Sequence, residues 1–169
     1  CLWKLDHSPF SRKIHTLPLY GRLAKEEQEK VFDPAPFGKK KVIISTNIAE
    51  TSVTISDITT VIDAGLAKLN FYNPRTFTSS LNDTAISKAS CNQRKGRAGR
   101  TQPGICYRLY SRKDYDTRPM YTTEEIYRTD LSEVVLRMAE LGITDFYNFD
   151  FIASPGKEGI IGAVDTLNM

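Results

Sequence analysis

The sequence predicts an α/β fold in which a largely parallel sheet is flanked by helices. Three short apolar runs have the length of strands: Ile14–Tyr20, Val42–Ser45 and Thr59–Asp63. A charged helical segment, Ala24–Phe32, separates the first two runs. The run Val42–Ser45 is nearly all apolar, which is typical of strands buried on both faces of a parallel sheet. A content of 40% hydrophobic and 25% charged residues in 169 is ordinary for one globular domain, or one domain and part of the next.

The first strand and helix end at residues with strong local preferences. Gly21 closes the first apolar run in a loop. The helix begins at Ala24, which has no side-chain oxygen to cap the first turn, so we expect its start to be weaker by about 1 kcal/mol. The segment Asp33–Pro36 stops this helix, because a residue that precedes proline disfavours the helical conformation.

A polar loop, Thr46–Ile55, follows the strand Val42–Ser45. Ligands bind at the carboxyl ends of strands in α/β sheets, and this loop lies at such an end. Its short hydroxyl and amide side chains can hydrogen-bond phosphates and 2′-hydroxyls without reading bases. The same residue types also favour local turns and caps, so the residues alone leave both interpretations open.

A hairpin is predicted after the strand Thr59–Asp63. Two strand-like runs, Leu66–Tyr72 and Phe77–Leu81, flank the turn residues Asn73–Thr76. An ordinary surface hairpin is one interpretation of this pattern.

The rest of the chain predicts two helices and a strand. Ser87 is suited to cap the first helix, and the turn Thr101–Gly104 ends it because proline cannot continue a helix. The apolar and aromatic run Ile105–Tyr110 predicts another core strand. Apolar residues at helical spacing in Leu131–Leu141, with Gly142 as the C-terminal cap, predict a helix used for packing.

The segment Gln93–Arg100 has the strongest chemical signal. As a helix, it places Gln93, Arg97 and Arg100 at positions i, i+4 and i+7, on one face. Gly96 and Gly99 each cost about 1 kcal/mol relative to alanine, which indicates that a backbone or ligand comes close to this helix. Two guanidinium forks beside an amide suit a triphosphate. A solvated basic face is the alternative.

These segments resemble helicase motifs in the right order. Gln93–Arg100 resembles motif VI of superfamily 2 helicases in the DEAH/RHA form, and Thr46–Ile55 closely resembles motif V of the same group. Tyr20-Gly21-Arg22 resembles the motif IV region. The resemblance implies that residues 1–142 form the second RecA-like lobe, of the P-loop NTPase type. Residues 143–169 resemble the start of a winged-helix domain.

The resemblance implies catalytic roles for motif VI. Arg97 and Arg100 correspond to arginine fingers that act across the cleft between two lobes, and Gln93 corresponds to a glutamine at the γ-phosphate. Ser52 corresponds to a serine that senses the nucleotide state.

Contacts to the adenosine are also implied. Phe32 aligns with a phenylalanine that stacks on adenine, although a core phenylalanine closing the helix is equally consistent with the residues. Where the family often has Asp-Gly at the ribose, this chain has Ser56-Asp57. Ser56 is a weaker ligand and Asp57 is displaced by one position.

The resemblance further implies contacts with the nucleic-acid backbone. The residues expected to make them are Tyr20, Gly21 and Arg22 in motif IV and Thr46, Asn47, Thr51 and Thr54 in motif V. The hairpin is expected to lie against the nucleic acid, with Arg75 and Lys68 as phosphate contacts. For Gly21, a simple turn glycine is an equally good interpretation.

Two parts of an ATPase are absent from this sequence: a GxxxxGK[ST] loop and an Asp-Glu-Ala-His box. In the family both belong to the first RecA-like lobe, which is therefore expected to hold the ligands of Mg²⁺, and no metal site is predicted here. A strand that carries the first part of motif IV is also expected before residue 1. We expect this chain, which starts at Cys1 without methionine and resembles a fragment, to be inactive alone.

The resemblance implies that the parent is an ATP-dependent RNA helicase that couples hydrolysis to 3′–5′ translocation on RNA and to duplex or RNP remodelling. Its expected partners are single-stranded RNA, the other domains of the same chain and a G-patch-type activator. The alternatives are a non-catalytic RNA- or protein-binding module and a DNA-directed superfamily 2 helicase.

Charge and cysteine content add weaker constraints. A net charge of +3 with a pI near 8.7 permits nucleic-acid binding without arguing for it. No run of about 18 apolar residues occurs, so no membrane span is expected. Cys1, Cys91 and Cys106 have no metal-ligand spacing, which predicts reduced thiols in a cytoplasmic or nuclear protein.

Overall fold

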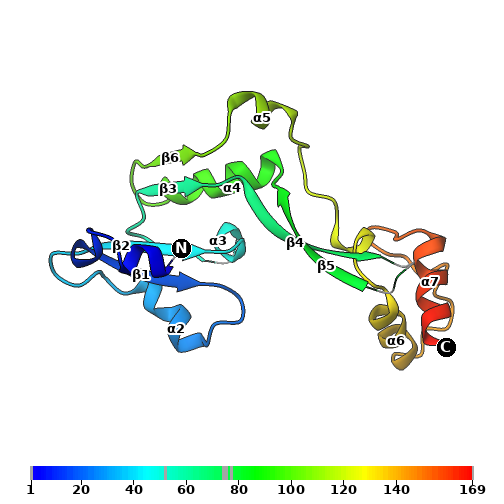
Figure 1. Cartoon of the computed structure of the whole chain (residues 1–169). Coiled ribbons are helices and arrows are strands. Elements are labelled where there is room, and N and C mark those ends of the chain that lie inside the picture. Colours follow the sequence, from blue (N-terminus) through cyan, green and yellow to red (C-terminus); the bar gives the residue numbers. More distant parts are fainter. Residues whose placement is uncertain (1, 52, 74–75, 77, 169) are drawn as a thin grey trace. The chain divides into compact units, whose positions relative to one another are not determined.

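The computed structural model describes residues 2–51, 53–73, 76 and 78–168. The chain forms two compact units (Figure 1). Unit 1 comprises Cys1–Ala67 and Ala85–Tyr121, and unit 2 comprises Lys68–Thr84 and Thr122–Met169.

Unit 1 contains two pairs of parallel strands. Strands β1 (Ile14–Leu19) and β2 (Lys40–Ser45) pair in register from Ile14 opposite Lys40 to Leu19 opposite Ser45. Strands β3 (Thr60–Asp63) and β6 (Ile105–Arg108) pair from Thr60 opposite Ile105 to Asp63 opposite Arg108. The predicted α/β class with parallel pairing is thus confirmed. Within the described residues, however, the two pairs are not joined into one sheet.

Helices precede, connect and follow these strands. In the described part of unit 1 they are α1 (Leu2–Asp6), η1 (Ser11–Lys13), α2 (Lys25–Glu29), η2 (Lys30–Phe32), α3 (Ile48–Thr51), α4 (Lys88–Ala98) and α5 (Arg112–Thr117). The helix expected over Ala24–Phe32 is an α-helix followed by a 3₁₀ turn that begins at Lys30. Ala24 lies at the N-cap and makes no side-chain cap hydrogen bond, as its lack of a side-chain oxygen requires.

The core of unit 1 lies between β1 and the end of the α2–η2 segment. Leu17, Leu19 and Val31 are buried together, and partly buried Ile43 and Ile55 pack against them. Each fully buried aliphatic side chain of this size contributes about 1.5–3 kcal/mol. This core anchors β1 and β2, and therefore the two loops that follow their carboxyl ends.

The β3–β6 pair is buried on one face only. Val61 and Asp63 belong to the face that packs on α4, whereas Ile62, Ile105 and Tyr107 are 70%, 57% and 55% exposed. The expectation that Thr59–Asp63 and Ile105–Tyr110 are buried strands is therefore wrong for this face. Successive side chains alternate across a strand, and α4 covers a single side.

Unit 2 is built from a hairpin and three helices. Strands β4 (Leu66–Asn73) and β5 (Thr78–Ala85) form the predicted hairpin, followed by η3 (Glu125–Tyr127), α6 (Ser132–Glu140) and α7 (Lys157–Leu167). The backbone N–H of Tyr72 donates to the Arg128 carbonyl at 2.8 Å, and the Arg128 guanidinium donates to the Asn70 carbonyl at 3.0 Å. The hairpin is thereby attached to the helical part of the unit.

Helices α6 and α7 share a small core of Leu131, Val135, Ile160 and Ala163. The segment 122–142 thus packs with the C-terminal tail.

The helix predicted over Leu131–Leu141 is confirmed with shorter bounds, and Gly142 takes a positive φ of 79° as expected of a C-terminal glycine. Val134 and Leu141 are 38% and 69% exposed, so the predicted apolar stripe is only partly used.

Candidate functional site

Two predicted nucleic-acid segments lie next to each other. Tyr20, Gly21 and Arg22 follow the carboxyl end of β1, and Thr46 and Asn47 follow that of β2. All five are exposed.

Backbone and side-chain hydrogen bonds join the two loops. The Thr46 N–H and the Ser45 hydroxyl both donate to the Leu19 carbonyl, each at 3.1 Å. Parallel pairing therefore brings the motif IV and motif V segments to one edge of the unit.

The remaining predicted RNA contacts are more dispersed. Thr51 ends α3, and Thr54 is exposed shortly after it. Lys68 lies on β4 and forms an exposed ion pair with Asp83 at 3.5 Å. Arg75 and Ser52 lie outside the described residues.

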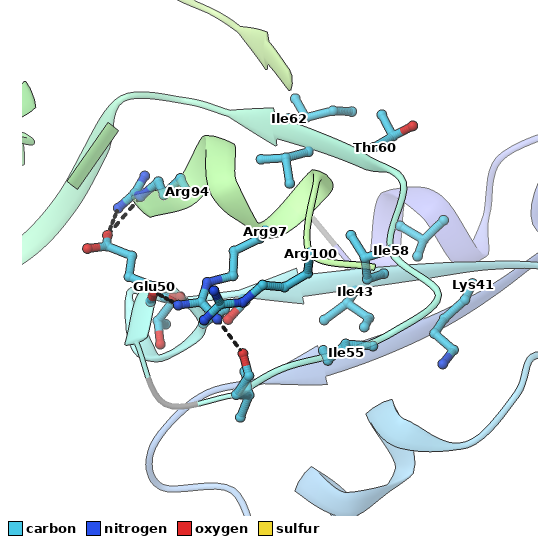
Figure 2. A pocket seen from close by; sticks show the side chains of 16 residues that line it. Lys41, Ile43, Glu50, Ile55, Ile58, Thr60, Ile62, Arg94, Arg97 and Arg100 are labelled. Atoms are coloured by element: carbon cyan, nitrogen blue, oxygen red, sulfur yellow. Dashed lines mark hydrogen bonds and ion pairs between the residues drawn. The ribbon is translucent and has the colours of Figure 1, made fainter. Parts of the chain in front are cut away.

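A cavity of about 370 Å³ separates β2 from β3. Its walls are mainly apolar, with Ile43, Ile55 and Ile62 among the contributing side chains (Figure 2). Three arginines of the motif VI segment, Arg94, Arg97 and Arg100, line it as well. Positive charge beside apolar surface is poorly screened, which strengthens its attraction for an anion.

Helix α4 carries only part of the motif VI segment. It begins at Ser87, whose hydroxyl accepts the Ser90 N–H at 3.2 Å, so the predicted cap is confirmed. It ends at Ala98, with Gly99 outside helical geometry at φ −108° and ψ 22°. The expectation that Gln93, Arg97 and Arg100 share one helical face is therefore wrong, because Arg100 lies beyond the last turn.

Arg97 and Arg100 form a cationic pair. Arg97 donates to the Val53 carbonyl at 2.7 Å and also to the Glu50 carbonyl. Burial, followed by the positive charge of Arg100, lowers the pKa of Arg97. Among the described residues, neither guanidinium forms an ion pair with a carboxylate. Two neighbouring guanidiniums without a carboxylate partner favour a bound polyanion.

Arg94 is engaged quite differently. Its guanidinium lies between the carboxylates of Glu50 and Asp63, with nitrogen–oxygen distances of 2.7 and 2.9 Å. Burial alone would lower the pKa of Arg94, but hydrogen bonds to Glu50 and Asp63 raise it overall. Sequence reasoning did not identify this group. The available signal was Asp63 itself, a carboxylate at the end of an apolar run, since aspartate is rarely buried without a partner.

Gln93 is exposed and is not among the described residues that line the cavity. A Cβ built on Gly96 or Gly99 would meet no atom of the described chain within 4 Å. The close approach that these glycines predict is therefore not made by the described residues, and the space beside them is open.

Of the residues predicted to contact adenosine, Asp57 is paired with Lys41. The Lys41 ammonium is 2.8 Å from the Asp57 carboxylate and donates to the Val31 carbonyl at 2.9 Å. Phe32 follows Val31 in the chain and is 52% exposed. The Ser56 carbonyl accepts a hydrogen bond from the Thr101 hydroxyl. Asp57 is thus occupied by Lys41, a buried cation that the sequence reasoning did not identify.

The described part of the chain contains no group of three or more His, Cys, Asp or Glu side chains placed to hold a metal ion. None of its helices has the length and apolar character needed to cross a bilayer.

The family described as "helicase conserved C-terminal domain" matches residues 4–102, which is more than half of the chain. This range contains both loops at the strand ends and all of α4.

Three relatives are similar over nearly the whole chain. The ATP-dependent RNA helicase HrpA of Borreliella burgdorferi is 58% identical over 88% of this chain and 18% of its own length. A HrpA homolog of Haemophilus influenzae is 45% identical over 89% of this chain and 11% of its own length. The chloroplastic ATP-dependent RNA helicase DEAH12 of Arabidopsis thaliana is 48% identical over 89% of this chain and 8% of its own length. The chain spans less than a fifth of each relative.

Two crystal structures of HrpB from Escherichia coli have the same fold. One, described as a DExH-box NTPase, superposes with a TM-score of 0.80 at 34% identity over 92% of this chain and 19% of its own. The other, described as a DEAH/RHA helicase, superposes with a TM-score of 0.85 at 34% identity over 92% of this chain and 20% of its own. The family match, the relatives and the solved structures agree, and the chain belongs to the helicase conserved C-terminal domain family as the C-terminal RecA-like lobe of a DEAH/RHA helicase.

Proposed function

We propose that this chain is the lobe of an ATP-dependent RNA helicase that supplies arginine fingers to ATP and a binding surface to RNA. The observation that carries the proposal is that Arg97 and Arg100 line one cavity and form no ion pair with a carboxylate of the described residues. The three relatives, each named as an ATP-dependent RNA helicase or its homolog, support it. The parent protein would be longer than this chain.

In the proposed reaction, Arg97 and Arg100 stabilise negative charge on the transferring γ-phosphoryl group. Arg97 would exchange its hydrogen bonds to the Val53 and Glu50 carbonyls for phosphate oxygens. Gln93 would contact the phosphate or the attacking water, and Ser52 would sense the nucleotide state. An exposed Gln93 is compatible with ATP bound at the outer surface of this lobe.

Phe32 would stack on the adenine, since its ring is half exposed and available to a ligand. Ser56 and Asp57 would contact the ribose. For Asp57 this contact requires that the carboxylate be shared with Lys41 or released from it, because their charged atoms are 2.8 Å apart.

RNA would lie across the strand-end loops. Its backbone would contact Tyr20, Gly21 and Arg22 from one loop and Thr46, Asn47, Thr51 and Thr54 from the other. Arg75 is proposed separately as a further phosphate contact. Contacts of this kind recognise RNA through the 2′-hydroxyl and not through base sequence. Opening and closing of the ATP cleft would move these contacting residues along the RNA in steps. Such movement would give 3′–5′ translocation and remodelling of duplexes or RNPs.

The missing parts of the ATPase are proposed to lie in a first RecA-like lobe of the parent. That lobe would supply the phosphate loop, the Asp-Glu-Ala-His box and the ligands of Mg²⁺. The described residues here offer no cluster suited to the ion. A G-patch-type activator, a domain boundary near Gly142 and a cytoplasmic or nuclear location belong to the same proposal.

The test is ATP hydrolysis by the parent protein with RNA and DNA oligonucleotides of equal length. We expect RNA to stimulate hydrolysis several-fold more than DNA, because only RNA offers 2′-hydroxyls to Thr46, Asn47 and Thr54. Equal stimulation would favour a DNA-directed helicase of the same superfamily. Absence of any nucleotide hydrolysis would favour a non-catalytic binding module.

The open space at Gly96 predicts that one substitution raises the stability of this chain and lowers the ATPase activity of the parent. Gly96→Ala should stabilise this chain by about 1 kcal/mol in urea unfolding, because the glycine lies inside α4 and no described atom obstructs a Cβ. In the parent it should reduce ATP hydrolysis, since the first lobe or the nucleotide would occupy that space.

Lys95→Ala, at the exposed neighbouring position, is the matched control and should change neither assay appreciably. Full ATPase activity of the Gly96→Ala parent would show that nothing approaches this helix closely.

A further inference from the structure

One arginine of the motif VI segment has no role in the proposed function. Arg94 lines the same cavity as Arg97 and Arg100, but its guanidinium is paired with two carboxylates of this chain. Its side chain is 16% exposed, and those of Glu50 and Asp63 are 12% and 0% exposed. A guanidinium neutralised by two carboxylates has little remaining attraction for phosphate. Arg94 is therefore unsuited to act as a third finger.

The two partners of Arg94 differ in how firmly they are held. Asp63 also accepts the Tyr110 hydroxyl at 2.8 Å and the Gly65 N–H at 2.9 Å, so it is fixed to the end of β3. Glu50 lies on the four-residue helix α3, between the loop at Thr46 and the segment at Thr54. Among the described residues, the Glu50 carboxylate pairs with Arg94. Asp63, with three donors, is therefore the more firmly held end of this bridge, and Glu50 is its more movable end.

Glu50 is held by two arginines of the same helix. Arg94 bonds its carboxylate, and Arg97, one turn later on α4, bonds its main-chain carbonyl (Figure 2). If Arg97 turns to a phosphate, the bond to the carbonyl is lost and the bond from Arg94 remains. Arg94 would then be the connection that keeps α3 attached to α4 while nucleotide is bound.

We propose that Arg94 is a positioning residue that couples the RNA-facing segment 46–54 to the nucleotide-facing helix α4 through Glu50. This inference rests on the proposed function and assigns a residue to the communication between its two sites. Binding of RNA to the loop would move Glu50, and through Arg94 would adjust the position of α4 and its fingers. Loss of this bridge would reduce the stimulation of ATP hydrolysis by RNA more than it reduces the basal rate of hydrolysis without RNA.

The test compares Glu50→Gln and Arg94→Lys in the parent protein. Glu50→Gln removes the charge of the movable end and leaves the Arg94–Asp63 pair intact, so the fold is preserved. We expect RNA stimulation of kcat to fall about tenfold, a typical coupling between sites, with the basal rate and the KM for ATP changed less than about threefold. Arg94→Lys should have an intermediate effect, because one ammonium cannot span both carboxylates.

Arg112→Ala is the matched control, since Arg112 is an 84% exposed arginine of the same unit paired with Asp116. It should leave stimulation unchanged. Undiminished RNA stimulation in Glu50→Gln would overturn the proposal. A loss of basal rate as large as that of stimulation would also overturn it, because Glu50 and Arg94 would then support the site itself.

A second readout does not depend on activity. Amide hydrogen exchange in the parent should accelerate at residues 48–54 in Glu50→Gln, whereas α4 and β3 keep their protection. Unchanged exchange at 48–54 would contradict the bridge even if the kinetic effects appeared. If the wild-type parent showed no RNA-stimulated hydrolysis, the proposed function would fail, and this exchange experiment would still decide whether Arg94 holds the segment.

Discussion

Replacing Arg97 with alanine should lower RNA-stimulated ATP hydrolysis by the parent protein by about 10³-fold, and Arg100→Ala should have a comparable effect. Both guanidiniums line one largely apolar cavity, and neither is neutralised by a carboxylate of the described residues. Their charge is therefore available to the γ-phosphoryl group in the transition state. Steady-state phosphate release at saturating RNA measures the loss.

RNA affinity separates this effect from a general loss of structure. In the absence of nucleotide, both variants should bind single-stranded RNA within about threefold of wild type, because the strand-end loops are held by β1 and β2. Arg97→Lys should recover little activity, since an ammonium lacks the planar fork. The exposed Arg112→Ala serves as the arginine control. Near-normal turnover of the Arg97 and Arg100 variants would refute the finger assignment.

Asp63→Ala should destabilise this chain by about 3–5 kcal/mol, the cost of removing one partner from a buried ion pair. The Asp63 side chain is fully buried, and its carboxylate accepts hydrogen bonds from Arg94, the Tyr110 hydroxyl and the Gly65 N–H. Burial, followed by hydrogen bonds to Cys91 and Asp63, raises the pKa of Tyr110, so the phenol stays protonated as a donor. Alanine would remove the acceptor that these three donors share, although Arg94 would keep Glu50. Urea unfolding followed by circular dichroism measures the change.

Two variants define the origin of this loss. Asp63→Asn retains an acceptor of similar shape but no charge, and should cost less than alanine. Asp83→Ala removes a carboxylate whose ion pair with Lys68 is exposed, and should cost less than about 1 kcal/mol. If Asp63→Ala were as mild as Asp83→Ala, Asp63 would not hold the centre of unit 1 together.

Local patterns predicted much of this fold. Apolar runs located β1 to β3, turn residues located the β4–β5 hairpin, and the hydroxyl of Ser87 located the start of α4. Each of these signals depends on a few neighbouring residues, so it predicts the position of an element without knowledge of the tertiary structure. Burial was predicted less well, as the exposed Ile62 and Tyr107 demonstrate, because it depends on which elements cover a strand.

Some features of the candidate site could likewise be predicted from the sequence, and others could not. The sequence by itself determined that two arginines, a polar loop after a strand and a family of helicase motifs occur together in this chain. Only the tertiary structure decided that α4 ends before Arg100, that Lys41 occupies Asp57, and that Arg94 bridges Glu50 and Asp63. The partners of Arg94 are 44 and 31 residues away along the chain. No local preference specifies such pairs, and they form only when packing of α4 on β3 and α3 brings the buried charges within reach of each other.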